Sequence, residues 1–254
     1  MTEITAEAIK DYLPDEYKKI SITAYKTVDS TNRAAKEMAS EGHALPLLVT
    51  ADCQTAGRGR LGRSFYSPAS TGIYMSLTVG GFSTPQNALF ITSVAAVAVV
   101  DAIISLTGKT PGIKWVNDIY LEGRKICGIL AEAQTLKNEV AVTVGIGINV
   151  TTSEFPQELT DVAGALNTDI PREKLIARIT KNLLRMCENP GDITIAERYR
   201  KHSVLLGKEI NYYFNGETKT AIAKDIDQSF GLVVQSEDGS YSTLSSGEVT
   251  VRLK

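Results

Sequence analysis

A loop rich in glycine and arginine, residues 51–68, is the part of this chain best suited to bind an anion. It alternates three glycines with three arginines, which are Gly57, Arg58, Gly59, Arg60, Gly62 and Arg63. Glycine lets the backbone approach a ligand closely, and guanidinium groups supply positive charge and directed N–H donors. A solvated surface loop would have a similar composition, so an anion site requires support from other parts of the chain.

The same loop partly matches two phosphate-binding motifs. The run GRGRLG fits the dinucleotide fingerprint, and GRGRLGRS comes close to a P-loop. Both motifs must open a helix, whereas a proline and the strand-like stretch 72–79 follow here, and Arg63 replaces the lysine of the P-loop. We therefore reject both motifs.

Polar side chains also mark the start of a predicted helix after residue 28. Ser30, Thr31 and Asn32 precede a helix-forming run that Gly42 stops. Ser30 or Thr31 is a good N-cap, and capping alone would explain their presence. A helix amino terminus with three small polar side chains is also suited to a polar ligand group.

The segment 112–150 carries polar residues at the ends of its predicted strands. These residues are Asn117, Asp118, Lys125 and Asn149. Asp118 and Lys125 fit a simple ion pair across a hairpin as well as a catalytic pair. Gly128, Gly145 and Gly147 weaken strands, which indicates that a ligand or another backbone lies close to them.

Composition limits the class of protein. The chain has 254 residues, 43% hydrophobic and 22% charged, with a net charge of -2, as in an ordinary globular protein. This charge does not favour nucleic-acid binding. Three widely spaced cysteines indicate reduced thiols in the cytoplasm, and two histidines are too few for a three-histidine zinc site.

Neither end of the chain nor its apolar runs indicate a membrane. The first residues are acidic and lack the apolar core of a signal peptide. The longest apolar run, 88–100, is shorter than the roughly 18 residues that a membrane span needs. We expect a cytoplasmic protein in which this run is a buried helix.

Periodicity and turn residues predict an alternation of helices and strands. Helices are predicted at 5–13, 33–39, 86–106, 171–188 and 193–202, and strands at 20–28, 47–51, 71–80, 113–121, 125–133 and 139–150. Beyond residue 206, short alternating runs separated by Asn-Gly, Asp-Gly and Ser-Gly predict a small antiparallel barrel.

Four ordered segments resemble those of the biotin protein ligases, the biotin–acetyl-CoA-carboxylase ligases. They are VDSTN at 28–32, QTAGRGRLGRSFYS at 54–67, IKWVNDIYLEGRKICGIL at 113–130 and VGIGIN at 144–149. The resemblance implies an α+β fold. A catalytic domain of class II synthetase type, with a mixed or antiparallel central sheet and packed helices, would occupy 1–204. An SH3-like β-barrel would occupy 205–254.

The resemblance also implies roles for individual residues. Biotin would be bound by Ser30, Thr31, Asn32, Gln54, Arg58, Gly59, Arg60 and Lys125. The nucleotide would be bound by Arg60, Arg63, Phe65, Asn117, Asn149 and Arg252. Catalysis would fall to Lys125, Arg60 and Asp118, and Asp118 is also a candidate ligand of Mg²⁺.

The activity implied by the resemblance is ATP-dependent biotinylation in two steps. Biotin and ATP-Mg²⁺ give biotinyl-5′-AMP, and a lysine of a biotin carboxyl carrier protein then displaces AMP. The first step brings a carboxylate against a phosphate, so Arg60, Lys125 and Mg²⁺ are the groups that it needs. The nucleophile of the second step belongs to the partner, which is consistent with the scarcity of histidine.

Two positions depart from the family pattern. Val116 stands where a proline is usual, and Phe65 stands where a tryptophan is frequent. Only residues 1–27 precede the first motif, which is too few for a winged helix-turn-helix, so we expect a ligase that does not bind DNA. Family members often pair through a sheet edge, which makes a homodimer plausible.

Three other interpretations compete with the biotin ligase. The related lipoate ligases and octanoyltransferases share the catalytic architecture, but the GRGRLGR loop and the C-terminal β module favour biotin. A nucleic-acid module could use Phe65 and Tyr66 for stacking, although the chain lacks a wider basic stripe. A biotin sensor without activity is disfavoured by Asn117, Asp118 and Lys125.

Overall fold

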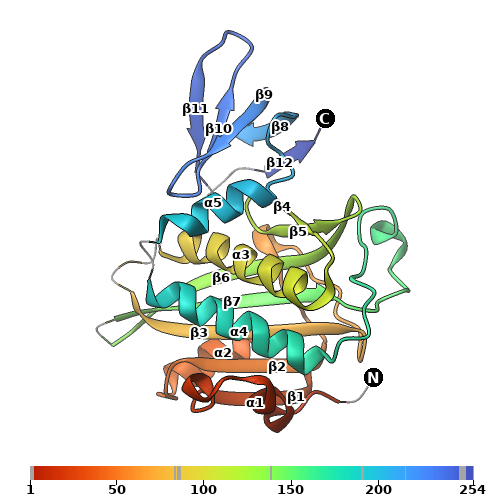
Figure 1. Ribbon diagram of the computed structural model, residues 1–254, viewed down its shortest axis with the longest axis vertical. Helices are drawn as coiled ribbons and strands as arrows, with labels where there is room; N and C mark the ends of the chain where they lie inside the picture. The colour runs from red at the N-terminus through yellow and green to blue at the C-terminus, as the bar shows by residue number, and fades with distance from the viewer. Residues whose placement is uncertain are drawn as a thin grey trace.

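A seven-stranded sheet forms the centre of the larger part of the molecule (Figure 1). The structure, a computed structural model, describes residues 3–82, 84, 87–137, 139–189, 192–214, 216–245 and 250–253. In spatial order the strands are β1 (Ser21–Val28), β2 (Leu47–Gln54), β3 (Gly72–Phe82), β7 (Glu139–Asn149), β6 (Arg124–Leu136), β5 (Asp118–Leu121) and β4 (Gly112–Lys114). The β1–β2 pair is parallel and the other pairs are antiparallel, so the prediction of a mixed sheet is confirmed.

Helices cover both faces of this sheet unequally. On one face lie α1 (Ala6–Tyr12), α3 (Asn87–Thr107) and α4 (Arg172–Glu188), with α5 (Ile193–His202) beside α3. The opposite face carries α2 (Thr31–Ser40), which lies behind the sheet in Figure 1 and packs on β2, β3 and β7. Short 3₁₀ turns occur at Asp15–Tyr17, Arg60–Gly62 and Gln157–Leu159. The face under α2 is therefore only partly covered, and the rest of it is available to a ligand.

Helix α3 is the most apolar element and lies in the core. Its stretch Phe90–Thr107 has a mean hydropathy of 2.1, and by length and composition alone it could cross a membrane. The stretch is thus longer than the apolar run noted in the sequence. Because 67% of it is buried against the sheet, α4 and α5, it has the character of a core helix, as predicted.

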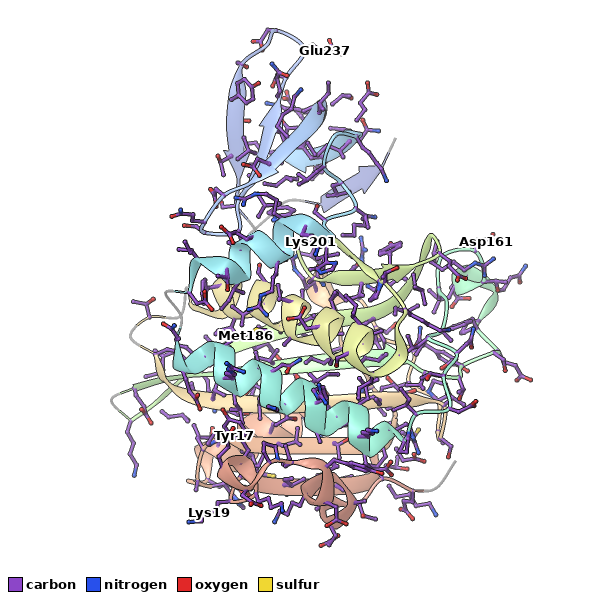
Figure 2. All side chains as sticks on the ribbon, viewed as in Figure 1. Tyr17, Lys19, Asp161, Met186, Lys201 and Glu237 are labelled. Atoms are coloured by element: carbon purple, nitrogen blue, oxygen red, sulfur yellow. The ribbon has the colours of Figure 1, made fainter. Side chains whose placement is uncertain are left out.

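A second sheet forms the C-terminal part of the molecule. Its five antiparallel strands, in the order β11-β10-β9-β8-β12, are Tyr241–Leu244, Leu232–Gln235, Glu217–Ile226, Glu209–Phe214 and Thr250–Leu253. Figure 2 shows Glu237 at its outer end and Lys19 at the opposite end of the molecule. The sheet agrees with the expected SH3-like module, whereas the division of the chain at 204/205 stays a prediction.

The predicted strand 113–121 is wrong, because the chain turns back on itself there. Strands β4 and β5 form an antiparallel hairpin in which Lys114 pairs with Asp118, and residues 115–117 are the turn. Trp115 Nε1 donates to the carbonyl oxygen of Phe230 at 2.8 Å, and the Tyr199 hydroxyl donates to that of Val116 at 3.1 Å. These two contacts from distant parts of the chain hold the turn, and the turn positions Asn117 and Asp118.

Candidate active site

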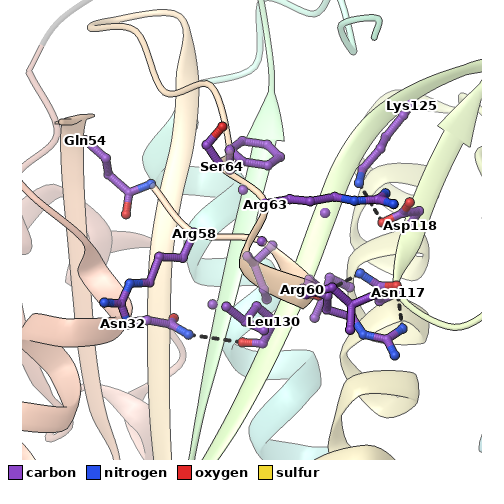
Figure 3. Close-up of a pocket in the computed structure, with 18 of the residues that line it drawn as sticks. Asn32, Gln54, Arg58, Arg60, Arg63, Ser64, Asn117, Asp118, Lys125 and Leu130 are labelled. Atoms are coloured by element: carbon purple, nitrogen blue, oxygen red, sulfur yellow. Dashed lines mark hydrogen bonds and ion pairs between the residues drawn. The ribbon is translucent and has the colours of Figure 1, made fainter. Parts of the chain in front are cut away.

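A cavity of about 380 Å³ lies on the face of the sheet that carries α2, a size typical of small-molecule sites (Figure 3). It brings together the start of α2, the glycine–arginine loop and the β4–β6 hairpins. Of the residues predicted for the site, it is lined by Ser30, Thr31, Asn32, Gln54, Arg58, Gly59, Arg60, Arg63, Phe65, Asn117, Asp118 and Lys125. Predicted site residues that lie up to 95 positions apart in the sequence thus line one cavity. A loop that is only a solvated surface feature would not need to meet these other segments.

The floor of the cavity is made of backbone. Gly128 in β6 is paired with Gly147 in β7, and Gly145 is the next glycine along β7. A Cβ atom at Gly147 would lie 2.5 Å from the Phe65 ring, and one at Gly145 would overlap the Asn32 carboxamide. The glycines were predicted to admit a ligand or another backbone, but the groups that approach them here are the side chains of Asn32, Phe65 and Lys125.

The start of α2 is turned toward the cavity and does not cap itself. Ser30 occupies the N-cap position, yet its side chain makes no capping hydrogen bond. The Thr31 amide donates to Gln54 Oε1 at 2.9 Å, and Thr31 Oγ1 lies 3.1 Å from the same oxygen. Ser30, Thr31 and Asn32 are each at most 4% exposed. The capping explanation for Ser30 is therefore wrong, and its hydroxyl remains available to a ligand.

The glycine–arginine loop folds over the cavity through a tight turn. Gly59 N donates to Arg63 O at 2.7 Å, and Leu61 and Gly62 both have positive φ, of 56° and 73°. Arg60 Nη1 donates to Asn117 Oδ1 at 3.1 Å, which connects the loop to the β4–β5 turn. Burial lowers the pKa of Arg60, and the charge of Asp118 opposes this shift. No helix follows the loop, in agreement with the rejection of the two motifs.

Asp118 and Lys125 form an ion pair at the wall of the cavity. Lys125 Nζ lies 2.7 Å from Asp118 Oδ1, and both side chains are partly exposed. In Figure 3 the Arg63 side chain points toward this pair. The ion pair that was predicted across the hairpin is thus present. Because both residues line the cavity, the same pair is also placed where a catalytic pair would have to be.

Of the two remaining residues predicted for the site, Asn149 is not among the described residues that line the cavity. Asn149, which is buried at the end of β7, donates from Nδ2 to the carbonyl oxygen of Gly164 at 3.0 Å. The backbone of Arg252 lies in β12, where it pairs with Asn211, but its side chain lies outside the described part of the chain. Their nucleotide-binding roles stay predictions.

The cavity also contains residues that were not predicted for it. The principal additions are Ser64, Lys114, Trp115, Tyr120, Leu130, Leu159 and Val162. Lys114 Nζ lies 5.3 Å from the centroid of the Tyr120 ring. The position of Lys114 next to Trp115, within the segment 113–130, could have indicated that it belongs to the site. Leu159 and Val162 come from an irregular segment held by the 2.9 Å bond from Lys125 N to Val162 O. Since this segment has no periodicity, its position could not be predicted.

The described side chains contain no group of three histidine, cysteine, aspartate or glutamate residues placed to hold a metal ion. Asp118 is the only carboxylate among the described residues that line the cavity. A metal ion at this cavity would therefore depend on oxygen atoms supplied by a substrate.

Comparison with known proteins identifies the family to which this fold and cavity belong. Residues 24–149 match the model of the biotin/lipoate A/B protein ligase family. The biotin–[acetyl-CoA-carboxylase] ligase of Mycobacterium tuberculosis is 30% identical over 241 residues, which cover 91% of this chain and 86% of that protein. The chain therefore belongs to the biotin/lipoate A/B protein ligase family.

Two further comparisons define the extent of this likeness. The bifunctional ligase/repressor BirA of Bacillus spizizenii is 43% identical over 143 residues, which cover 55% of this chain but only 44% of that protein. The biotin protein ligase of Aquifex aeolicus, solved in complex with biotin and ATP, has a TM-score of 0.76 and 28% identity. That match covers 92% of this chain and 99% of the Aquifex chain, so the predicted fold is confirmed.

Proposed function

We propose that this protein activates biotin with ATP as biotinyl-5′-AMP and transfers the biotinyl group to a lysine of a biotin carboxyl carrier protein. The observation that carries the proposal is the convergence of the α2 start, the arginine loop and the Asp118–Lys125 pair on one cavity. The Aquifex relative, which was solved with biotin and ATP, and the name of the Mycobacterium relative support this choice of substrates.

The polar end of the cavity suits the ureido ring of biotin. A cyclic urea has two N–H donors and one carbonyl acceptor. Thr31 Oγ1 and Gln54 Oε1 lie side by side and can accept from one N–H group, and the Ser30 hydroxyl is a donor without a capping partner. The ring would thus leave few buried polar groups unsatisfied, which is the condition for tight recognition.

The other end of the cavity suits a carboxylate that meets a phosphate. Arg60, Arg63 and Lys125 place positive charge around it, whereas the Arg58 side chain extends toward Asn32 in Figure 3. In the first step a biotin carboxylate oxygen attacks the α-phosphorus of ATP, and the bond from that phosphorus to pyrophosphate breaks. Cations fixed in place before the reaction offset the repulsion between the two anions. A magnesium ion would enter with the ATP phosphates, with Asp118 as a carboxylate within reach, and would neutralise phosphate charge.

The second step needs a nucleophile from the carrier protein. Its lysine amine attacks the biotinyl carbonyl carbon, the bond to the AMP oxygen breaks, and the amine loses a proton. Asp118 is the carboxylate on the cavity wall that can orient this amine or accept its proton. A cytoplasmic location, a homodimer and the absence of DNA binding stay predictions from the sequence.

Mass spectrometry of a carrier domain tests the proposal. The domain is incubated with the protein, ATP-Mg²⁺ and an equal mixture of biotin and lipoate. We expect a biotinyl group on one lysine, and none when ATP is omitted. Lipoylation instead would retain the family and replace the substrate, whereas biotin binding without any transfer would favour a sensor.

A further inference from the structure

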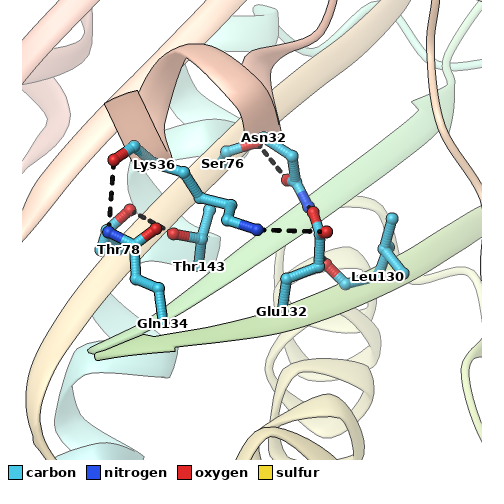
Figure 4. A network of polar contacts seen from close by, with 8 residues as sticks. All are labelled: Asn32, Lys36, Ser76, Thr78, Leu130, Glu132, Gln134 and Thr143. Atoms are coloured by element: carbon cyan, nitrogen blue, oxygen red, sulfur yellow. Dashed lines mark hydrogen bonds and ion pairs between the residues drawn. The ribbon is translucent and has the colours of Figure 1, made fainter. Parts of the chain in front are cut away.

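Ser76 of β3 contacts the start of α2 but is not among the described residues that line the cavity (Figure 4). Its side chain is fully buried, and Gly145 is its partner in the neighbouring strand. Ser76 Oγ lies 2.6 Å from Asn32 Oδ1 and 2.8 Å from Thr31 Oγ1. Ser76 thus contacts two of the three polar residues that begin α2.

The orientation of the Asn32 carboxamide is fixed from the other side. Asn32 Nδ2 donates to the carbonyl oxygen of Leu130 at 3.2 Å and to Glu132 Oε2 at 3.0 Å. Lys36 Nζ in turn lies 3.4 Å from Glu132 Oε1. Both Asn32 protons therefore have acceptors, and Asn32 Oδ1 must be the atom that faces Ser76.

This orientation determines where the hydroxyl protons go. A carboxamide oxygen cannot donate, so the single Ser76 proton is used in the short bond to Asn32. The 2.8 Å contact between Ser76 and Thr31 then requires the Thr31 proton. Thr31 has a second acceptor in Gln54 Oε1, but that oxygen is farther away, at 3.1 Å.

The consequence is a pair of acceptors directed at the cavity. When Thr31 donates to Ser76, its own lone pairs remain available. Gln54 Oε1, which accepts the Thr31 amide, also keeps a second lone pair. Without Ser76, the Thr31 proton would turn to Gln54 and occupy that lone pair.

We propose that Ser76 is a positioning residue that makes the cavity select a ligand whose ring presents N–H donors, one of them to Thr31 and Gln54. This inference rests on the proposed function and deepens it, because a cyclic urea presents such donors and the dithiolane ring of lipoate presents none. Unpaired buried acceptors disfavour a ligand that lacks donors, so the same arrangement discriminates between the two acids.

The test compares Ser76→Ala with Thr78→Val. Thr78 Oγ1 shares a 2.9 Å hydrogen bond with Thr143 Oγ1, is fully buried and lies on the same face of β3, but it does not line the cavity. Each variant removes one buried hydroxyl bond, so the two should lose similar stability. Calorimetry measures the dissociation constants of biotin and of ATP separately, alongside the melting temperature.

We expect Ser76→Ala to weaken biotin binding roughly fivefold to tenfold, as for one buried hydrogen bond, and Thr78→Val to change it less than about twofold. ATP binding should stay constant in both. Ser76→Cys, which keeps a weak donor, should give an intermediate loss. Equal biotin affinity in all variants would overturn the inference and leave the proposed function intact. An absence of biotin binding by the unaltered protein would overturn both.

Discussion

Asp118 and Lys125 show how an ion pair that adds little stability can serve chemistry. Their 2.7 Å contact lies at the cavity wall, where both side chains remain partly exposed. Pairs of this kind contribute about 0–1 kcal/mol, because solvent screens the charges and ordering the side chains costs entropy. The value of the pair lies in orientation, since Asp118 holds Lys125 toward the cavity before the substrates bind.

Replacement of Asp118 should therefore affect turnover more than binding. We expect Asp118→Asn to slow biotin transfer roughly 100-fold, the lower range for the loss of a general base, with biotin affinity nearly intact. Glu122→Gln is the control, because it removes a carboxylate from an exposed position on the adjacent turn. Pyrophosphate release and carrier labelling measure the two steps separately, and unchanged rates in Asp118→Asn would remove the assignment.

The sequence indicated most residues of the cavity, because their types are unusual for their positions. Arginines between glycines, and Asp118 and Lys125 at strand ends, have little reason to be there for packing alone. Ser76 gave no such signal, because a serine within a strand is ordinary. Its importance depends on the proximity of Asn32, which lies 44 positions away in the chain.

The glycine–arginine loop has firmly held ends and a lightly held middle. At its ends, the buried Arg172 lies 2.7 Å from Asp52 Oδ1 and donates from Nη1 to Gly72 O at 2.9 Å, while Ser70 Oγ donates to Asp52 Oδ2. In the middle, Arg60 Nη1 donates to Asn117 Oδ1 across the cavity. Such an element can open without disturbing the sheet.

Limited trypsin digestion should detect this difference. We expect cleavage after the loop arginines, which include the exposed Arg58 and Arg63, to slow at least about fivefold when biotinyl-AMP is bound, because the ligand favours the closed loop. Cleavage after Lys137, which is exposed in the turn between β6 and β7, serves as the internal control. Equal rates of loop cleavage with and without the adenylate would contradict closure.

Most helices and strands followed from periodicity, but the β4–β5 turn did not. The run IKWVNDIYL alternates well enough for one strand, and it contains neither glycine nor proline. Tertiary contacts hold this turn. Trp115 and Val116 are buried, Trp115 donates a hydrogen bond to Phe230, and Val116 accepts one from Tyr199. Local sequence cannot reveal partners that lie more than 80 positions away.

At the scale of the molecule, Phe230 docks the small sheet onto the part that contains the cavity. Its ring makes T-shaped contacts with Tyr199 at 5.4 Å and with Phe90 at 5.3 Å, and its carbonyl oxygen accepts from Trp115. Arg200 of α5 adds a 2.5 Å contact to Asp225 of β9. The C-terminal sheet thereby supports the turn that carries Asn117.

Truncation of Phe230 should accordingly affect both stability and activity. We expect Phe230→Ala to lower the free energy of unfolding by about 3–5 kcal/mol, as for other buried aromatic side chains, and to reduce turnover because the turn loses its support. Tyr241→Ala is the control, since Tyr241 is 63% exposed on the same sheet. Chemical denaturation and initial rates provide the measurements. If Phe230→Ala lost stability but kept full turnover under conditions in which it is folded, docking of the C-terminal sheet would not be required for catalysis.

The burial of α3 also fixes an order of events during synthesis on the ribosome. The elements that pack on this apolar helix, β6, β7, α4 and α5, all follow it in the chain. The ribosome must therefore add roughly a hundred residues after the helix before all of them exist, which takes roughly 5–20 s at ordinary elongation rates. Until the last of them is made, the nascent chain carries an incompletely covered helix as apolar as a membrane span, so the core around α3 can close only after the synthesis of α5.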